Sequence, residues 1–215
     1  GGYTASRKVL TSMTAGEVID TISKANLRGL GGAGFPASRK WSFIPKDSTQ
    51  PKYLVVNADE GEPGTFKDRY IMERDPHALL EGMIIAAYAI GSHKAYVYIR
   101  GEYFRSAKRL QRAIDEAYNS NWLGRDIQGS GFDLDVVIHR GAGAYICGEE
   151  TALLTSLEGG KGFPKIKPPF PAISGLFKCP TIVNNVETLA CVPFILRNGP
   201  ERFAEIGSDT QGGTR

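Results

Sequence analysis

The sequence predicts an α/β fold, a Rossmann-like and largely parallel sheet with helices on both faces. Amphipathic helical segments alternate along the chain with short β-branched runs that have the composition of buried strands. A glycine-rich turn also joins one of these runs directly to a helix, an arrangement that places ligands at the carboxyl ends of parallel strands. We expect residues 1–215 to form one such domain.

The first half of the chain predicts two helices and one strand. Residues 14–27 have the pattern of an amphipathic helix in which Thr14 and Glu17 make a capping box. Residues 52–56, Lys-Tyr-Leu-Val-Val, are typical of a buried strand. Asp75 as N-cap and Pro76 at the first helical position begin the second helix, which Gly91 ends.

The second half continues this alternation of strand and helix. We predict a strand over 94–100, a helix over 103–118 and an alternating strand over 133–139. A small-residue turn over 141–145 follows, and a helix opens at Gly148. The proline-rich residues 164–171 predict a stiff, extended loop.

Composition and charge argue against several kinds of partner. The formal net charge is +3 and the basic and acidic residues are interspersed, so we expect no nucleic-acid-binding face. The longest apolar run, residues 83–90, is too short for direct membrane insertion. The cysteines and histidines are isolated, without the close pairs typical of a disulfide framework or a complete zinc or iron–sulfur site, so no metal site is predicted: Cys147, Cys179, Cys191, His77, His93 and His139.

The segment Gly29 to Pro36 has four glycines in six positions and matches the letters of the dinucleotide fingerprint G-x-G-x-x-G. That fingerprint follows a strand, whereas this loop follows a predicted helix. We therefore interpret it as a phosphate or flavin cradle of another kind, with Lys40 adding a positive charge, or alternatively as a plain glycine turn. The second glycine-rich turn favours a cofactor pocket, with tight helix–sheet packing as its alternative.

The acidic segment 57–64 begins where the predicted strand over 52–56 ends. Its carboxylates would repel phosphate but suit ribose and ribityl hydroxyls, and Asn57 could hydrogen-bond a ring edge. Polyol or cofactor binding is one interpretation. A magnesium or calcium site, without EF-hand spacing, and a solvated acidic loop are the alternatives.

Five segments in this order resemble the NADH-oxidising, FMN-bearing subunit of respiratory complex I, and the resemblance covers essentially the whole chain. The same module occurs in NAD-linked hydrogenases and formate dehydrogenases. The segments are residues 29–41, 53–69, 141–152, 167–171 and 180–188.

The resemblance implies two sets of binding residues. The residues implied for FMN are Gly29, Gly31, Gly32, Gly34, Lys40, Asn57, Asp59, Glu60, Gly148, Glu149, Val183, Asn184, Asn185 and Thr188. The residues implied for NADH are Phe35, Phe43, Glu62, Tyr145, Glu150, Lys167 and Phe170. In this assignment the aromatic rings stack on adenine, the lysine meets phosphate and the acids meet hydroxyls.

The reaction implied is hydride transfer from C4 of the nicotinamide to N5 of FMN, with no side chain acting as acid or base. Electrons would then pass singly to iron–sulfur clusters and a quinone. The implied partners are iron–sulfur subunits, including a thioredoxin-like [2Fe–2S] subunit, on the cytoplasmic side of a bacterial inner membrane or the matrix side of the mitochondrial one. The alternatives are the diaphorase module of a hydrogenase or formate dehydrogenase, and a redox-dead nucleotide-binding or assembly remnant.

The chain departs from the family pattern in two places. Leu30 stands where the family usually has arginine between the first two glycines of the loop. Family members also continue into a ubiquitin-like domain and a helical [4Fe–4S] domain, and we expect both to be absent from these 215 residues.

Overall fold

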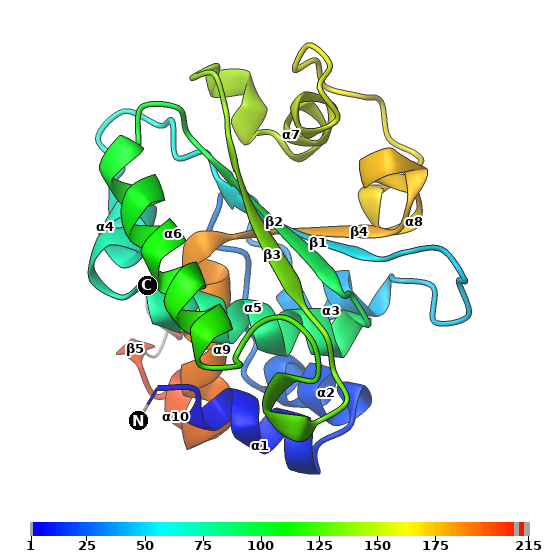
Figure 1. Cartoon of the computed structure of the whole chain (residues 1–215), viewed down its shortest axis with the longest axis vertical. Coiled ribbons are helices and arrows are strands. Elements are labelled where there is room, and N and C mark those ends of the chain that lie inside the picture. The colour runs from blue at the N-terminus through cyan, green and yellow to red at the C-terminus, as the bar shows by residue number, and fades with distance from the viewer. Residues whose placement is uncertain (1, 209–210, 213–215) are drawn as a thin grey trace.

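A four-stranded parallel sheet forms the centre of the computed structural model, which describes residues 2–208 and 211–212. The strand order is β3-β2-β1-β4 (Figure 1). The strands are β1 (Tyr53–Ala58), β2 (Lys94–Ile99), β3 (Asp135–Arg140) and β4 (Thr181–Asn185). The three strands predicted from the sequence are confirmed, and β4 is an additional one.

Helices precede, connect and follow these strands. The α-helices are α1 (Thr4–Ser12), α2 (Ala15–Lys24), α3 (Ala37–Ser42), α4 (Lys67–Arg74), α5 (Pro76–Ile90), α6 (Phe104–Asn119), α7 (Glu150–Leu157), α8 (Pro171–Ser174), α9 (Val186–Asn198) and α10 (Pro200–Ala204). Short 3-10 helices are η1 (Ile127–Gly129), η2 (Tyr145–Gly148) and η3 (Leu176–Lys178), and β5 (Gly207–Ser208) pairs with β6 (Gln211–Gly212) in a small antiparallel ladder. None of the helices in residues 2–208 and 211–212 has the length and apolar character needed to cross a bilayer.

The predicted start of α2 and both predicted ends of α5 are confirmed by their capping residues, whereas α2 ends at Lys24, three residues before the predicted end. Glu17 donates its backbone N–H to Thr14 Oγ1 (3.3 Å), and the Thr14 N–H donates to Glu17 Oε2 (2.7 Å), which completes the capping box. Asp75 Oδ1 accepts the N–H of Ala78 at the start of α5 (3.2 Å). Gly91 ends this helix in the left-handed conformation, with φ of 70°.

The two faces of the sheet carry separate hydrophobic clusters, which confirms the prediction of helices on both faces. Alternate residues of β1 point in opposite directions, so Leu54 and Val56 belong to the larger cluster and Val55 to the smaller. Figure 1 shows α5 and α9 on the side of the larger cluster and α7 on the other. A Cβ at Gly82 of α5 would collide with the backbone carbonyl of Leu189 in α9, so this glycine permits the close packing of the two helices.

The strand order places a topological switch point between β1 and β4. The chain proceeds from β1 to β2 and β3 on one side, and β4 is then added on the other side of β1. Asn57 and Asn185 are paired at the carboxyl ends of these two parallel strands. Open α/β sheets bind ligands outside the carboxyl ends of their strands at such a point, so a binding site is expected at this edge.

Candidate cofactor and nucleotide site

Two adjoining cavities, of about 590 and 790 Å³, lie over the carboxyl ends of β1 and β4. We call the smaller one the polar cavity, because carboxylates and amides line it, and the larger one the aromatic cavity, after Phe35, Phe43 and Phe170. Their shared wall consists of Gly31, Gly32, Asn57, Gly148 and Asn185. All the site residues implied by the sequence line one or both cavities, apart from Thr188.

The glycine loop between α2 and α3 forms part of this shared wall. Gly32 and Gly34 have φ of 143° and 64°, and a Cβ at either would meet no atom within 4 Å. The loop is closed by a hydrogen bond from the Gly29 N–H to the Phe35 carbonyl (2.9 Å). The expected helix precedes this loop, so it is not the strand-linked dinucleotide fingerprint.

Thr188 anchors the glycine loop instead of lining a cavity. Its Oγ1 accepts the N–H of Leu30 (2.9 Å), and its side chain is fully buried in the first turn of α9. Gly31 lies directly over β4, since a Cβ there would come within 3.0 Å of the Asn185 Cβ. These contacts fix the position of the loop above the switch point.

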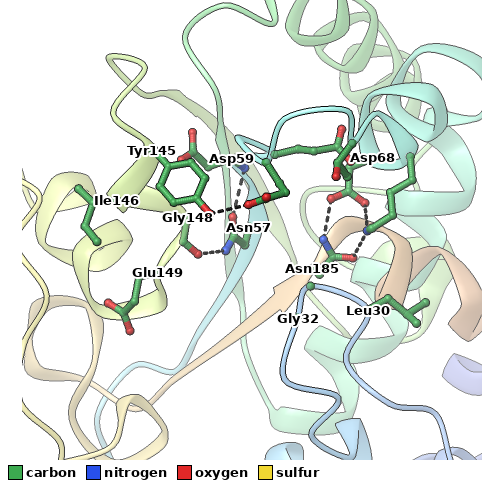
Figure 2. A pocket seen from close by; sticks show the side chains of 15 residues that line it. Leu30, Gly32, Asn57, Asp59, Asp68, Tyr145, Ile146, Gly148, Glu149 and Asn185 are labelled. Atoms are coloured by element: carbon green, nitrogen blue, oxygen red, sulfur yellow. Dashed lines mark hydrogen bonds and ion pairs between the residues drawn. The ribbon is translucent and has the colours of Figure 1, made fainter.

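The acidic turn after β1 is held by Asn57. Its Nδ2 donates to the carbonyl of Gly148 (2.7 Å), so β1 is tied directly to the segment that leads into α7 (Figure 2). Its Oδ1 accepts the N–H of Asp59 (3.1 Å). Asn57 therefore organises the wall between the two cavities.

Asp59 has a buried carboxylate with an unsatisfied oxygen. The residue is 7% exposed, and its Oδ2 has no hydrogen-bond partner among the described residues. Burial raises the pKa of this carboxyl to about 6, and the nearby Arg100 only partly opposes that shift. A buried acceptor without a partner costs free energy, so a ligand hydroxyl that donates to it would be stabilised there.

Glu60, the next residue, has an internal role. Its oxygens accept the N–H groups of Asp68 (2.9 Å) and Arg69 (3.1 Å) in the first turn of α4, and Oε2 also accepts from the Tyr103 hydroxyl (3.2 Å). Glu60 thus stabilises a helix N-terminus at the edge of the polar cavity. A direct contact between Glu60 and a cofactor stays a prediction.

Lys67 and Asp68 are cavity residues that the sequence did not reveal. The Lys67 Nζ lies 2.7 Å from Asp68 Oδ1, 3.1 Å from Asn185 Oδ1 and 3.2 Å from Glu187 Oε2. Asn185 Nδ2 donates to Asp68 Oδ2 (2.6 Å), so its amide orientation is fixed from both ends (Figure 2). Both residues lie within the segment 53–69 that carries the family resemblance, a few residues after the acidic segment, but neither was assigned a role from the sequence.

The other asparagine of this motif, Asn184, points toward α3. Its Oδ1 accepts the indole N–H of Trp41 (2.8 Å), and Asn184 is 5% exposed. Val183 packs in the smaller hydrophobic cluster. Both residues line the aromatic cavity, but both are almost completely buried, at 4% and 5% exposed.

The three phenylalanines of the aromatic cavity are not core residues. Phe35, Phe43 and Phe170 are 42%, 45% and 58% exposed. The rings of Phe35 and Phe43 have centroids 6.0 Å apart at a tilt of 43°. Exposed aromatic faces on a cavity wall suit a planar ligand such as a purine base.

Glu150 connects the two lysines of this cavity. Lys40 lies 3.0 Å from one carboxylate oxygen and Lys167 lies 2.6 Å from the other. Burial alone would raise the pKa of Glu150, but Coulombic attraction to Lys40 and the hydrogen bond from Lys167 bring it below its usual value. Burial alone would lower the pKa of Lys167, and the bond to Glu150 raises it above its usual value.

A second pair of predicted residues, Glu62 and Tyr145, lines the polar cavity. The Tyr145 hydroxyl donates to Glu62 Oε2 (2.6 Å). Glu149, the N-cap of α7, accepts the N–H groups of Thr151 and Ala152 (2.8 and 2.9 Å). Within residues 2–208 and 211–212, no group of three or more His, Cys, Asp or Glu side chains is placed to hold a metal ion.

Comparison with known proteins places this site in a family context. The model of the Nuo51 FMN-binding domain matches residues 22–194. The chain is 59% identical to an NADH-quinone oxidoreductase subunit of Rhizobium meliloti over 215 residues, which are 100% of the chain and 51% of that protein. It is 58% identical to the corresponding NADH-quinone oxidoreductase subunit of Rickettsia bellii over 92% of the chain and 48% of that protein.

Solved structures give the same picture. A chain of the NAD⁺-reducing [NiFe]-hydrogenase in the H₂-reduced state has a TM-score of 0.88 and 39% identity, and the match covers 99% of our chain and 36% of that one. A chain of such a hydrogenase in the air-oxidized state has a TM-score of 0.82 and 42% identity, and the match covers 93% of our chain and 33% of that one. The chain spans about half the length of the curated relatives it matches.

Proposed function

Because the chain belongs to the family of Nuo51 FMN-binding domains, we propose that it is the flavin module of an NADH dehydrogenase, one α/β domain that binds FMN and NADH side by side. The observation that carries the proposal is the wall shared by the polar and aromatic cavities. Two ligands seated in adjoining cavities would contact each other beside these shared residues, and hydride transfer between them would then need only correct positioning.

The residues of the polar cavity fit FMN. Asp59 Oδ2 is a buried acceptor in need of a hydroxyl, which the ribityl chain supplies. The open space beside Gly32, which lines both cavities, lets a flat or anionic group approach the backbone closely. Bound FMN would accept a hydride and release electrons one at a time, and the chain's own residues would bind and orient it.

The aromatic cavity fits NADH. Its phenylalanines offer faces for adenine, and Lys40 and Lys167 offer positive charge for the pyrophosphate. Glu150 would form hydrogen bonds with ribose or nicotinamide groups of the nucleotide. Glu62 and Tyr145, which line the adjoining polar cavity, would do the same. None of these side chains would have to gain or lose a proton, since the bound ligands themselves would supply and accept the hydride.

We place the module in a larger redox assembly. Electrons would leave to iron–sulfur clusters held outside this domain and then to a quinone, with iron–sulfur subunits, including a thioredoxin-like [2Fe–2S] subunit, as partners. The names of the curated relatives, which are NADH-quinone oxidoreductase subunits, support a quinone as the final acceptor. The peripheral position we propose is the cytoplasmic side of a bacterial inner membrane, or the matrix side of the mitochondrial one.

A second candidate is the diaphorase module of an NAD-linked hydrogenase, which the match to hydrogenase chains favours. The higher identity to the quinone oxidoreductase subunits ranks it second. A formate dehydrogenase module and a redox-dead remnant rank below both candidates. Gel filtration after incubation with FMN tests the remnant: we expect the chain to keep the visible absorption of the flavin, and a colourless chain would favour the remnant.

A further inference from the structure

Two charged residues of the loop after β2 contact the acidic turn from outside the cavities. Arg100 follows β2 directly, and its Nη1 donates to the backbone carbonyl of Glu60 (3.2 Å). The Tyr103 hydroxyl donates to the same carbonyl (3.2 Å). Glu102 pairs with the Arg100 Nε at 3.2 Å. Neither Arg100 nor Glu102 is among the described residues that line the polar or the aromatic cavity, so their effect on a ligand has to pass through the turn.

The side chain of Arg100 is held in place beside the turn. Its backbone N–H donates to the carbonyl of Ala58 at the end of β1 (3.3 Å), and its guanidinium lies over the ring of Tyr103, 5.9 Å from the centroid. The Arg100 side chain is 31% exposed, whereas that of Glu102 is 53% exposed. The positive charge is therefore fixed and partly shielded, and charge interactions are stronger there than in bulk water.

The small-residue turn after β3 leaves room for this pair. A Cβ at Gly101 would come within 2.5 Å of the carbonyl oxygen of Gly141, so the loops after β2 and β3 can pack closely because this residue is glycine. A Cβ at Gly143 would come within 2.7 Å of Glu102 Oε1. The absence of a side chain at Gly143 thus leaves the Glu102 carboxylate free to reach Arg100.

Arg100 and Glu102 act on the buried carboxyl of Asp59 with opposite sign. Burial has the largest effect on the pKa of this carboxyl and raises it, the positive charge of Arg100 lowers it, and the negative charge of Glu102 raises it. The Tyr98 hydroxyl of β2 is also in electrostatic contact with Asp59, and the Cys147 thiol of η2 is in hydrogen-bond contact with Tyr98. Burial raises the pKa of Tyr98 to about 12, so this hydroxyl stays neutral while Asp59 titrates.

We propose that Arg100 and Glu102 are a positioning pair for the flavin: Arg100 fixes the acidic turn and presents a positive charge to the Asp59 carboxylate, and Glu102 withholds part of that charge. The ionised carboxylate is then ready to accept a hydroxyl of the ribityl chain. The inference rests on the proposed function for its ligand. It adds two residues outside the cavities that set the pH range in which the polar cavity can bind FMN.

The test measures two quantities in the same set of variants. NMR of the carboxyl carbon gives the pKa of Asp59 in the flavin-free chain, and fluorescence titration over a pH series gives the affinity for FMN. Arg100→Gln removes the positive charge, and Glu102→Gln removes the negative one. Arg140→Gln is the matched control, because Arg140 Nη2 donates to the carbonyl of Gly101 in the same loop (2.6 Å) but is not among the charges that act on Asp59.

We expect the two charge variants to move the pKa of Asp59 in opposite directions. Arg100→Gln should raise it from about 6 by roughly one unit, since the loss of a nearby opposite charge typically has at least this effect, and Glu102→Gln should lower it. The pH at which half of the FMN affinity is lost should move in the same direction in each variant. Arg100→Lys, which keeps the charge, and the control Arg140→Gln should both stay close to the wild-type pKa.

An unchanged pKa of Asp59 in both charge variants would overturn the proposal, as would shifts in the same direction or an equal shift in Arg140→Gln. Glu102 is half-exposed, so Glu102→Gln tests the pair even if Arg100→Gln does not fold: an unchanged or raised pKa of Asp59 then has the same consequence. Failure of the wild-type chain to bind FMN would instead overturn the proposed function. The NMR measurement needs no flavin and so distinguishes the two failures.

Discussion

Asn57 Oδ1 accepts a hydrogen bond from the backbone N–H of Asp59 at 3.1 Å. This contact fixes the turn at the end of β1 and, with the bond from Asn57 Nδ2 to Gly148, ties it to the start of α7. The Asp59 carboxylate is thereby held in the wall of the polar cavity with Oδ2 unpaired among the described residues. Its burial and its unpaired oxygen have consequences for flavin binding and for folding.

Replacing Asp59 by alanine should weaken FMN binding by about tenfold or more, because a hydrogen bond to a charged group contributes roughly 1.5–3 kcal/mol. The measurement is flavin retained after gel filtration, with thermal unfolding of the flavin-free chain as the control for folding. We expect Asn185→Ala also to reduce occupancy. Unchanged flavin content in both variants would show that these residues are wrongly placed.

FMN affinity should depend on pH through Asp59. The pKa of its carboxyl is raised from 3.8 to about 6 by burial, so the group takes up a proton as the pH falls through that value. A ribityl hydroxyl donates to the ionised form, so affinity should be full above about pH 6 and fall below it. Asp59→Asn should flatten this profile, and an equally steep profile in the variant would assign the titration to another group.

The same group should affect folding in the opposite direction. Because its folded pKa lies above the unfolded value, the flavin-free chain binds more protons when folded, and the stability from Asp59 is lost as the pH rises from about 4 to about 6. Denaturant unfolding at several pH values, with Asp59→Asn for comparison, measures this contribution. A contribution that grows with rising pH would contradict the burial argument.

Truncating Phe170 should affect ligand binding more than folding. The side chain is 58% exposed, whereas Phe203 of α10 is 4% exposed. We expect Phe170→Ala to raise the NADH dissociation constant roughly tenfold, since stacking on a base contributes about 1–3 kcal/mol. Its melting temperature should hardly move, while the control Phe203→Ala should lose about 3–5 kcal/mol of stability. A large loss of stability with normal NADH binding by Phe170→Ala would favour a packing role.

Glu150 should also favour NADH over NADPH. An ionised acid accepts hydrogen bonds from ribose hydroxyls but repels the additional phosphate of NADPH. We expect Glu150→Gln to raise NADPH oxidation relative to NADH by roughly tenfold, about 1.4 kcal/mol. Anaerobic flavin reduction by each nucleotide gives the ratio. A ratio that stays constant while flavin occupancy is intact would leave Glu150 as a residue of the helix N-terminus alone.

Local signals in the sequence predicted much of the fold. Asp75, Pro76 and Gly91 mark the ends of α5, because caps and left-handed glycines are encoded by single residues. The helix α4 was missed, since only Asp68 and Met72 of its eight residues are buried and its apolar pattern is weak. The five-residue strand β4 was also missed, because residues 180–188 were interpreted only through their resemblance to the family.

The sequence predicted those site residues whose position follows from their neighbours along the chain. It could not predict roles that depend on contacts between residues far apart in the sequence. Asp59 lies in a run of carboxylates directly after a strand, so its place at the sheet edge follows from the sequence. The role of Thr188 depends on Leu30, 158 residues away along the chain. The capture of both lysines by Glu150 likewise requires three segments to be brought together by folding.

Anaerobic titration of the FMN-loaded chain with NADH tests the central claim most directly. The claim is that the polar and aromatic cavities seat a flavin and a nicotinamide against a shared wall. We expect one FMN per chain, whose visible absorption is bleached in proportion to the NADH added until one equivalent is consumed. Retention of FMN without bleaching, or failure to retain FMN at all, would contradict the account.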